Sequence, residues 1–175
     1  MSVRLRAATL TDVPYLVALA SDPTVEPFLA AARAKDEDAV RAEVARAEAE
    51  PDAFGVLVIE LDRDGEWSAV GAVQWQLVNR RSRIAELSGL ALEPGARGAG
   101  VAADATRQLQ RLLLLGRGLH RLQLEVYAFN EPALRHAERV GFVREGVRRR
   151  AYWRHGTWVD GVLFGLLRED LDAAT

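Results

Sequence analysis

The segment from Arg97 to Ala102 has residue types and spacing that suit the binding of a phosphate-like anion. A strand is predicted before it and a helix after it. The first backbone N–H groups of a helix lack intrahelical partners, and the helix dipole adds partial positive charge. Gly98 and Gly100 have no side chains that would keep an anion from the backbone, and Arg97 adds a formal positive charge. Taken alone, the segment is as compatible with a purely structural glycine turn as with an anion-binding site.

Two common nucleotide-binding motifs do not fit this segment. A P-loop ends in Gly-Lys-Ser/Thr, whereas Ala102 and Ala103 stand where that ending would fall. A dinucleotide fingerprint tolerates alanine at its third glycine. However, the preceding strands have an antiparallel pattern, and no acidic residue follows at a strand end about 20 residues on. An anion bound here would therefore come from another class of ligand.

The elements that would position this turn alternate between strand and helix patterns. Strands are predicted at residues 3–7, 54–61, 67–78, 83–92, 119–127, 143–152 and 157–167, with hairpin turns at 62–65 and 154–156. Helices are predicted after an N-cap at 11–12, over 36–50, over 100–116 with Leu109, Leu112 and Leu113 on one face, and over 130–140 before Gly141. This order predicts a mixed α/β (α+β) sheet, neither a regular βαβ repeat nor a sandwich.

Composition indicates an ordinary globular protein, and we expect residues 1–175 to form one domain. The formal net charge of −2 argues against a generic nucleic-acid binder, and the absence of cysteine excludes disulfides, thiolate metal sites and a cysteine nucleophile. The three histidines lack ligand spacing, so no metal site is expected. No signal-peptide pattern follows the N-terminus, and the most apolar stretch, 112–115, is too short to span a bilayer. We therefore expect a cytoplasmic protein that does not contact a membrane.

Three segments carry a resemblance to a known family. Residues 90–102, Leu-Ala-Leu-Glu-Pro-Gly-Ala-Arg-Gly-Ala-Gly-Val-Ala, resemble the acetyl-CoA-binding segment of the GNAT N-acetyltransferase superfamily. Its signature, Gln/Arg-x-x-Gly-x-Gly/Ala, is matched by Arg97, Gly100 and Ala102. Residues 130–133, followed by residues 138–146, look like the second cofactor segment of the family. Residues 156–167 are similar to the branch that includes ribosomal-protein N-terminal (alanine/serine) acetyltransferases.

The resemblance implies a GNAT-like acyl-CoA N-acyltransferase fold, with a mixed, mostly antiparallel central sheet flanked by helices and with splayed central strands. Pantetheine would lie between those strands, and the pyrophosphate would bind the backbone N–H groups of the turn. Asn130 would contact the cofactor arm, cap its own helix, or do both. The implied acetyl-CoA-binding residues are Leu90, Ala91, Leu92, Arg97, Gly98, Ala99, Gly100, Val101, Ala102 and Asn130.

Acetyl transfer from a thioester to an amine needs a base, donors for the developing oxyanion and a proton for the departing thiolate. Glu86 is the candidate base, with a cross-strand pair to Arg83 or another arginine as the alternative, and Ser88 would share its face of the strand. The resemblance implies that the main-chain N–H near Leu90 is the oxyanion donor. Relatives carry a tyrosine or a serine as the acid where this chain has Ala137 and Ala133. Candidate substitutes are Tyr127, Tyr152 or water.

The resulting function hypothesis is direct transfer of acetyl from acetyl-CoA to a primary amine, without an acyl-enzyme. The acceptor would be a peptide N-terminus or a small-molecule amine. The alternatives are a non-catalytic acyl-CoA sensor and an interaction protein on the same fold, which would form a homodimer through the C-terminal hairpin. The basic residues Arg144 and 148–150 suit a solvated strand edge, an acidic acceptor or the cofactor phosphates, and the four tryptophans are expected to pack the hairpins.

Overall fold

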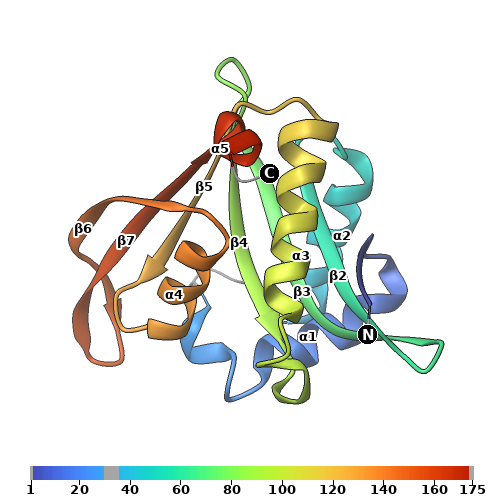
Figure 1. Cartoon of the computed structure of the whole chain (residues 1–175). Coiled ribbons are helices and arrows are strands. Elements are labelled where there is room, and N and C mark those ends of the chain that lie inside the picture. Colours follow the sequence, from blue (N-terminus) through green and yellow to red (C-terminus); the bar gives the residue numbers. More distant parts are fainter. Residues whose placement is uncertain (1, 30–35, 174–175) are drawn as a thin grey trace. The chain divides into compact units, whose positions relative to one another are not determined.

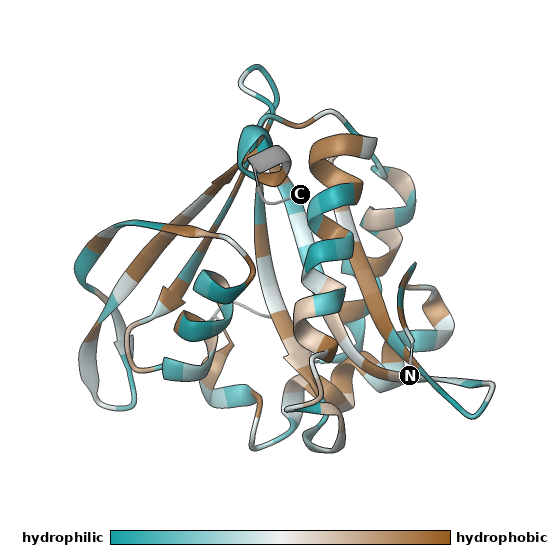
Figure 2. Cartoon of the chain, in the orientation of Figure 1, coloured by the Kyte–Doolittle hydropathy of each residue, from teal (hydrophilic) through white to brown (hydrophobic). Residues whose placement is uncertain are grey.

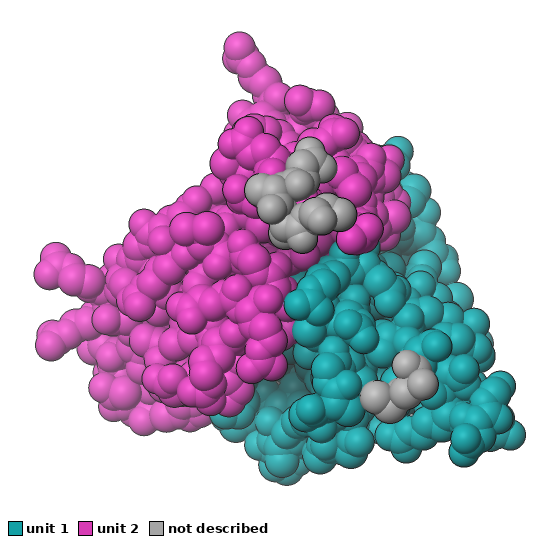
Figure 3. Space-filling view, viewed as in Figure 1, with its two compact units in different colours: residues 1–77, 87–108 teal, residues 78–86, 109–175 magenta. Residues whose placement is uncertain are grey.

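The computed structural model describes residues 2–29 and 36–173. The chain forms two compact units, drawn in different colours in Figure 3. Unit 1 comprises Met1–Leu77 and Leu87–Gln108, and unit 2 comprises Val78–Glu86 and Leu109–Thr175. Strand β4, Ile84–Leu92, belongs to both units. The hydrogen-bonded strand order is β1-β2-β3-β4-β5-β7-β6. The pairing of β4 with β5 is parallel and the β1–β2, β2–β3, β5–β7 and β6–β7 pairings are antiparallel, which confirms a mixed, mostly antiparallel sheet.

Unit 1 is built on strands β1 (Val3–Ala7), β2 (Phe54–Arg63) and β3 (Glu66–Asn79). Every residue of β2 from 54 to 61 is buried, as expected of a strand covered on both faces, and Figure 2 shows this strand as strongly hydrophobic. Asp64 and Gly65 join β2 to β3 with φ of 56° and 90°. Two left-handed residues are what a two-residue hairpin turn requires, so the predicted hairpin is confirmed.

Helices cover both faces of this part of the sheet (Figure 1). On one face, α1 (Val13–Ser21) and α2 (Glu37–Ala49) pack on Val56 and Val58 of β2. On the other face, α3 (Val101–Gln110) packs on Ile59 and Leu61, because alternate strand residues point to opposite faces. The Asp36 side chain accepts a hydrogen bond from the Ala39 N–H at 2.8 Å, which confirms the predicted start of α2.

A partly buried ion-pair cluster connects the N-terminal strand to its neighbours. The Arg6 guanidinium contacts both carboxylate oxygens of Asp12 at 2.7 Å and one oxygen of Glu60 at 2.8 Å. The hydrogen bond from Arg6 is the largest influence on Asp12 and lowers the pKa of that carboxyl from 3.8 to about 2. The cluster therefore links β1, β2 and the beginning of α1.

Unit 2 contains β5 (Arg121–Tyr127), α4 (Glu131–Arg139), β6 (Val143–Arg154), β7 (Thr157–Leu167) and α5 (Arg168–Ala173). Helix α5 was not among the elements predicted from the sequence. Gly141 follows α4 with φ of 94°, and His155 and Gly156 turn the β6–β7 hairpin with φ of 50° and 76°. The predicted end of the helix before Gly141 and the predicted hairpin turn are therefore confirmed.

The predicted helix over 100–116 changes type at its middle. Residues Arg111–Gly116 form a π-helix, and the Arg117 N–H donates to the Leu112 carbonyl five residues earlier. The wider turn rotates the following side chains relative to an α-helix. As a result Leu113 and Leu114 are buried while Leu112 is 42% exposed, so the prediction that Leu112 shares the buried face was wrong.

Candidate active site

The predicted anion turn joins β4 to α3 within unit 1. A short 3-10 helix, Pro94–Ala96, leads into it, and Gly98 and Gly100 both have φ of 83°. A Cβ added at either glycine would meet no atom within 4 Å, so the glycines serve the left-handed backbone rather than the available space. Alternating left-handed residues turn successive N–H groups toward one side, which forms a concavity suited to an anion.

The turn is exposed to solvent, whereas the helix that follows it, α3, is packed into the core. Residues 97–100 are exposed, but Val101 and Ala105 of α3 are buried in the core of unit 1. The unpaired N–H groups of the first helical turn are therefore held rigidly at an accessible surface. This arrangement can bind a phosphate group through backbone donors without first ordering the loop.

The Arg97 side chain stabilises the turn through hydrogen bonds. Its Nε and Nη2 donate to the Leu92 carbonyl oxygen at 3.0 and 2.9 Å, and Nη2 also donates to Thr24 Oγ1 at 2.8 Å. The guanidinium thus connects the end of β4 to the segment after α1. The charge predicted at the mouth of the turn is present, but the hydrogen bonds give Arg97 a positioning role that the sequence did not indicate.

The strand that precedes the turn, β4, contains Gly89, which has φ of 61°. The register pairs of β4 with β5 are Ile84↔Arg121, Ala85↔Leu122 and Glu86↔Gln123, and all of them come before this glycine. A left-handed residue inside a strand disturbs its regular pairing. Sequence reasoning missed Gly89, although a glycine within a strand pattern is a recognised signal for a bulge.

The residues predicted to contact pantetheine follow Gly89. Ala91 and Leu92 are buried and Leu90 is half-buried. A Cβ at Gly71 of β3 would clash with the Ala91 carbonyl oxygen, so glycine at 71 permits a close approach to β4. The main chain from 90 to 92 is consequently held in place from the β3 side, and the Leu92 carbonyl already accepts from Arg97.

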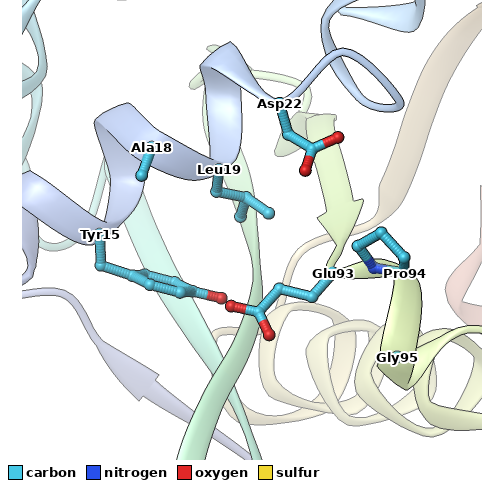
Figure 4. Close-up of a pocket in the computed structure, with 7 residues that line it drawn as sticks. All are labelled: Tyr15, Ala18, Leu19, Asp22, Glu93, Pro94 and Gly95. Atoms are coloured by element: carbon cyan, nitrogen blue, oxygen red, sulfur yellow. The ribbon is translucent and has the colours of Figure 1, made fainter.

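A shallow hollow of about 280 Å³ borders the beginning of the turn in unit 1. Figure 4 shows the Tyr15 hydroxyl and the Glu93 carboxylate pointing toward each other, with the Asp22 carboxylate at the end of α1. Burial and then the negative charge of Glu93 raise the pKa of Tyr15 above its ordinary value. Two carboxylates at this end favour a cation and oppose a phosphate. An anion is therefore favoured at the other end of the turn, at Gly98–Val101.

The candidate catalytic residues of β4 lie on its exposed side. Glu86 and Ser88 are exposed and alternate with buried Ala85 and Leu87, as strand geometry predicts. The Glu86 carboxylate accepts a hydrogen bond from Gln123 Nε2 at 3.1 Å. The cross-strand partner is therefore a neutral amide. The Arg83 side chain instead donates to the Gly118 carbonyl at 3.1 Å.

Asn130 and the two tyrosines belong to unit 2. The Asn130 side chain accepts from the Ala133 N–H at 3.2 Å, so it caps α4, and its contact with the cofactor stays a prediction. The Tyr127 and Tyr152 rings meet edge to face at 5.2 Å. Burial, followed by the neighbouring Glu125 carboxylate, raises the pKa of Tyr152 above its usual value. The Tyr152 hydroxyl is therefore a weaker acid than that of an ordinary tyrosine.

In the described ranges, no group of three or more histidine, aspartate or glutamate side chains is arranged to hold a metal ion. Within those same ranges, none of the helices is long and apolar enough to cross a membrane.

A mixed seven-stranded sheet with a glycine turn entering a helix beside β4 defines the acyl-CoA N-acyltransferase class of fold. The sequence model of the Acetyltransferase (GNAT) domain matches residues 2–143. This chain therefore belongs to the GNAT acetyltransferase family, and it is an acetyl-CoA-dependent N-acetyltransferase that transfers an acetyl group to an amine.

Individual relatives agree with this assignment. The SPbeta prophage-derived uncharacterized N-acetyltransferase YokL of Bacillus subtilis is 28% identical over 123 residues, which are 70% of this chain and 67% of the relative. A variant of spermidine N-acetyltransferase SpeG from Vibrio cholerae has a TM-score of 0.82 at 21% identity, with 99% of this chain and 98% of that chain covered. A structure of the Vibrio cholerae enzyme with CoA and spermine gives 0.81 at 22% identity, with 96% of each chain covered.

A crystal structure of a putative acetyltransferase is 28% identical, with a TM-score of 0.75 and coverage of 98% of this chain and 86% of that chain. The named structural neighbours are spermidine acetyltransferases. They do not specifically indicate the ribosomal-protein N-terminal acetyltransferase branch that residues 156–167 suggested.

Proposed function

We propose that the backbone of Arg97–Ala102 holds the pyrophosphate of acetyl-CoA and that the main chain of Leu90–Leu92 holds its pantetheine arm. The observation that carries this assignment is the pair of left-handed glycines, Gly98 and Gly100, at the exposed start of an anchored helix. Their N–H groups offer several donors to a diphosphate at once, and the helix dipole adds attraction. A thioester bound here supplies an activated acetyl group.

We propose that the amine attacks the thioester carbon directly. Glu86 takes a proton from the incoming ammonium, directly or through water, because its carboxylate is exposed and bonded only to a neutral amide among the described residues. Ser88 lies on the same side and positions the acceptor or a water molecule. As the carbon–nitrogen bond forms, the N–H near Leu90 stabilises the oxyanion. The nitrogen then releases its second proton to water, and the carbon–sulfur bond breaks to leave the amide and the thiolate.

The departing thiolate needs a proton from a group other than the usual one. Ala137 is buried and Ala133 is half-buried, and neither side chain can donate. Tyr152, Tyr127 and water are the candidate donors, and the raised pKa of Tyr152 makes its hydroxyl a weaker acid than that of an ordinary tyrosine.

The test is an assay of free-thiol release with acetyl-CoA and a panel of peptides and small-molecule amines. Glu86→Gln is expected to lower kcat by 100-fold or more, within the range of general base catalysis, while the KM for acetyl-CoA stays the same. Gln123→Ala is the matched control, because it removes the partner of Glu86 but keeps the carboxylate. Full activity in Glu86→Gln would show that another group is the base.

The sensor alternative requires binding of acetyl-CoA without turnover of any amine, and the comparisons favour the enzyme.

The remaining assignments extend this proposal. Asn130 contacts the cofactor arm through its amide nitrogen while its oxygen caps α4. The acceptor is a primary amine of a peptide N-terminus or of a small molecule, and the protein is cytoplasmic and able to form a homodimer. Cell fractionation and light scattering test the last two statements.

A further inference from the structure

We propose that the β6–β7 hairpin of unit 2 is a docking surface for an acidic polypeptide, whose amine is the acetyl acceptor. This inference rests on the proposed acetyl transfer and names the chemistry of its acceptor. The basic hairpin surface consists of Arg149, Arg150, Trp153 and Trp158.

Arg149 and Arg150 lie on a β-bulge that a hydrogen bond across the hairpin stabilises. Arg148 pairs with Gly161 and Tyr152 pairs with Val159, so residues 149–151 lie opposite the single residue Asp160. The Arg150 N–H donates to Asp160 Oδ1 at 2.7 Å, and Arg150 has φ of 49°. A left-handed backbone is unfavourable for arginine, so this hydrogen bond stabilises a conformation that the residue does not itself prefer. Such bulges redirect side chains away from the regular strand pattern.

Both guanidinium groups are available to a partner. Arg149 and Arg150 are exposed and line a surface hollow together with Asp160, and neither side chain forms an ion pair with a described residue. Arg148, in contrast, pairs with Glu125 at 3.3 Å. The planar fork of a guanidinium matches a carboxylate in two parallel hydrogen bonds. The bulge is therefore suited to aspartate and glutamate side chains.

Two tryptophans provide the apolar part of the surface. Trp153 and Trp158 are cross-strand partners whose rings meet at 5.2 Å and 69°, yet they are 59% and 57% exposed. The two tryptophans were expected to pack the hairpin; they do pack against each other, but most of each side chain is exposed. Trp158 and Asp160 are two residues apart on β7, so they project from the same face. Exposed tryptophan beside arginine is the composition of a protein-binding hot spot.

The charge of the chain is unevenly divided. Unit 2 contains 14 basic and 9 acidic residues, a net charge of +5, whereas unit 1 contains 9 basic and 16 acidic residues, a net charge of −7. The overall charge of −2 conceals this asymmetry. A polycationic acceptor would be repelled from the hairpin and an acidic one attracted. We choose a polypeptide over a nucleic acid because the reaction needs an aliphatic amine, which a peptide N-terminus or lysine supplies.

The direct test uses two short fluorescent peptides that share their N-terminal residues but have acidic or basic bodies. Binding is measured by fluorescence anisotropy without acetyl-CoA. The acidic peptide is expected to bind more tightly, and more weakly as salt is added. The Arg149→Gln/Arg150→Gly double variant should weaken its binding about tenfold, which corresponds to two exposed ion pairs. Glycine at 150 retains the left-handed backbone, so this variant should fold. Arg81→Gln, an exposed arginine elsewhere in unit 2, is the control.

Steady-state kinetics separate docking from chemistry. In the double variant the KM for the acidic peptide should rise by the same factor, with kcat and the KM for acetyl-CoA unchanged. Equal binding of the two peptides would overturn the proposal. Tighter binding of single-stranded RNA, or a homodimer that the double variant dissociates while peptide binding persists, would overturn it as well. Selective peptide binding without turnover would support the surface and refute acetyl transfer to that peptide.

Discussion

The Arg97 guanidinium donates two hydrogen bonds to the carbonyl oxygen of Leu92, five residues earlier in the chain. The bonds close a loop around the 3-10 helix at 94–96 and fix where the anion turn begins. A residue expected to contribute charge therefore also determines the position of the backbone donors.

Replacing Arg97 should therefore weaken cofactor binding by disturbing the turn. Arg97→Gln is expected to raise the Kd for acetyl-CoA about tenfold, since bonds to a charged group are worth about 1.5–3 kcal/mol and this one is partly exposed. Calorimetry with CoA measures the effect. Thr24→Val removes the bond between Arg97 and Thr24, together with the hydrogen bond from the Thr24 hydroxyl to Asp22, and should have a smaller effect. If the two variants lose equal affinity, the bonds to Leu92 are not the important ones.

The turn glycines provide a test with an internal control. Gly98→Ala and Gly100→Ala should each lose about 1 kcal/mol of stability from left-handed strain and bind CoA more weakly, because the donors are displaced. Gly95 is also surrounded by open space but has no positive φ. Gly95→Ala should consequently leave both the unfolding free energy and CoA affinity unchanged. A similar loss in all three variants would contradict the anion-turn assignment.

Asp12 should make stability depend on pH in the acid range. Its folded pKa is about 2 against an ordinary 3.8, so the ion pair with Arg6 stabilises the fold above pH 3.8 and is lost as the pH falls toward 2. Above pH 3.8 the ion pair contributes about 2 kcal/mol to the free energy of unfolding. Urea unfolding of wild type and Asp12→Asn at several pH values should show curves that converge as the acid limit is approached. A difference in unfolding free energy that stays constant with pH would contradict the assignment of this pH dependence to Asp12. Glu66→Gln, at an exposed carboxylate, is the control.

Gly161 should be intolerant of any side chain. A Cβ there would clash with Glu125 Oε1 and come within 2.9 Å of the Tyr152 ring. Gly161→Ala is expected to destabilise the protein by about 1–3 kcal/mol, as overpacking does. Gly146→Ala on β6 has open space and should have little effect. Adding Glu125→Ala to Gly161→Ala should recover part of the loss in thermal unfolding, and the absence of recovery would point to a backbone cause.

The two units should unfold together as the predicted single domain. Strand β4 passes from unit 2 into unit 1 after Glu86, and the helical segment starting at Val101 passes back after Gln108. Neither unit can unfold without breaking an element that continues into the other. Circular dichroism and tryptophan fluorescence should give one coincident transition in urea. Two separated transitions would show independent domains.

The sequence by itself determined the features that depend on neighbouring residues. The strand patterns, the hairpin at Asp64–Gly65, the cap at Asp36 and the glycine turn before α3 all follow from interactions over a few positions. They were sufficient to indicate the family, since the anion turn is itself a local structure.

Only the tertiary structure decided the features that depend on distant residues. The bond of Arg97 to Thr24, the pairing of Glu86 with Gln123 and the exposure of Leu112 after the π-helix are set by packing between segments far apart in the chain. The bulge at Arg150 depends on Asp160 across the hairpin. Local periodicity carries no information about such partners, because it reports the shape of an element and not what that element packs against.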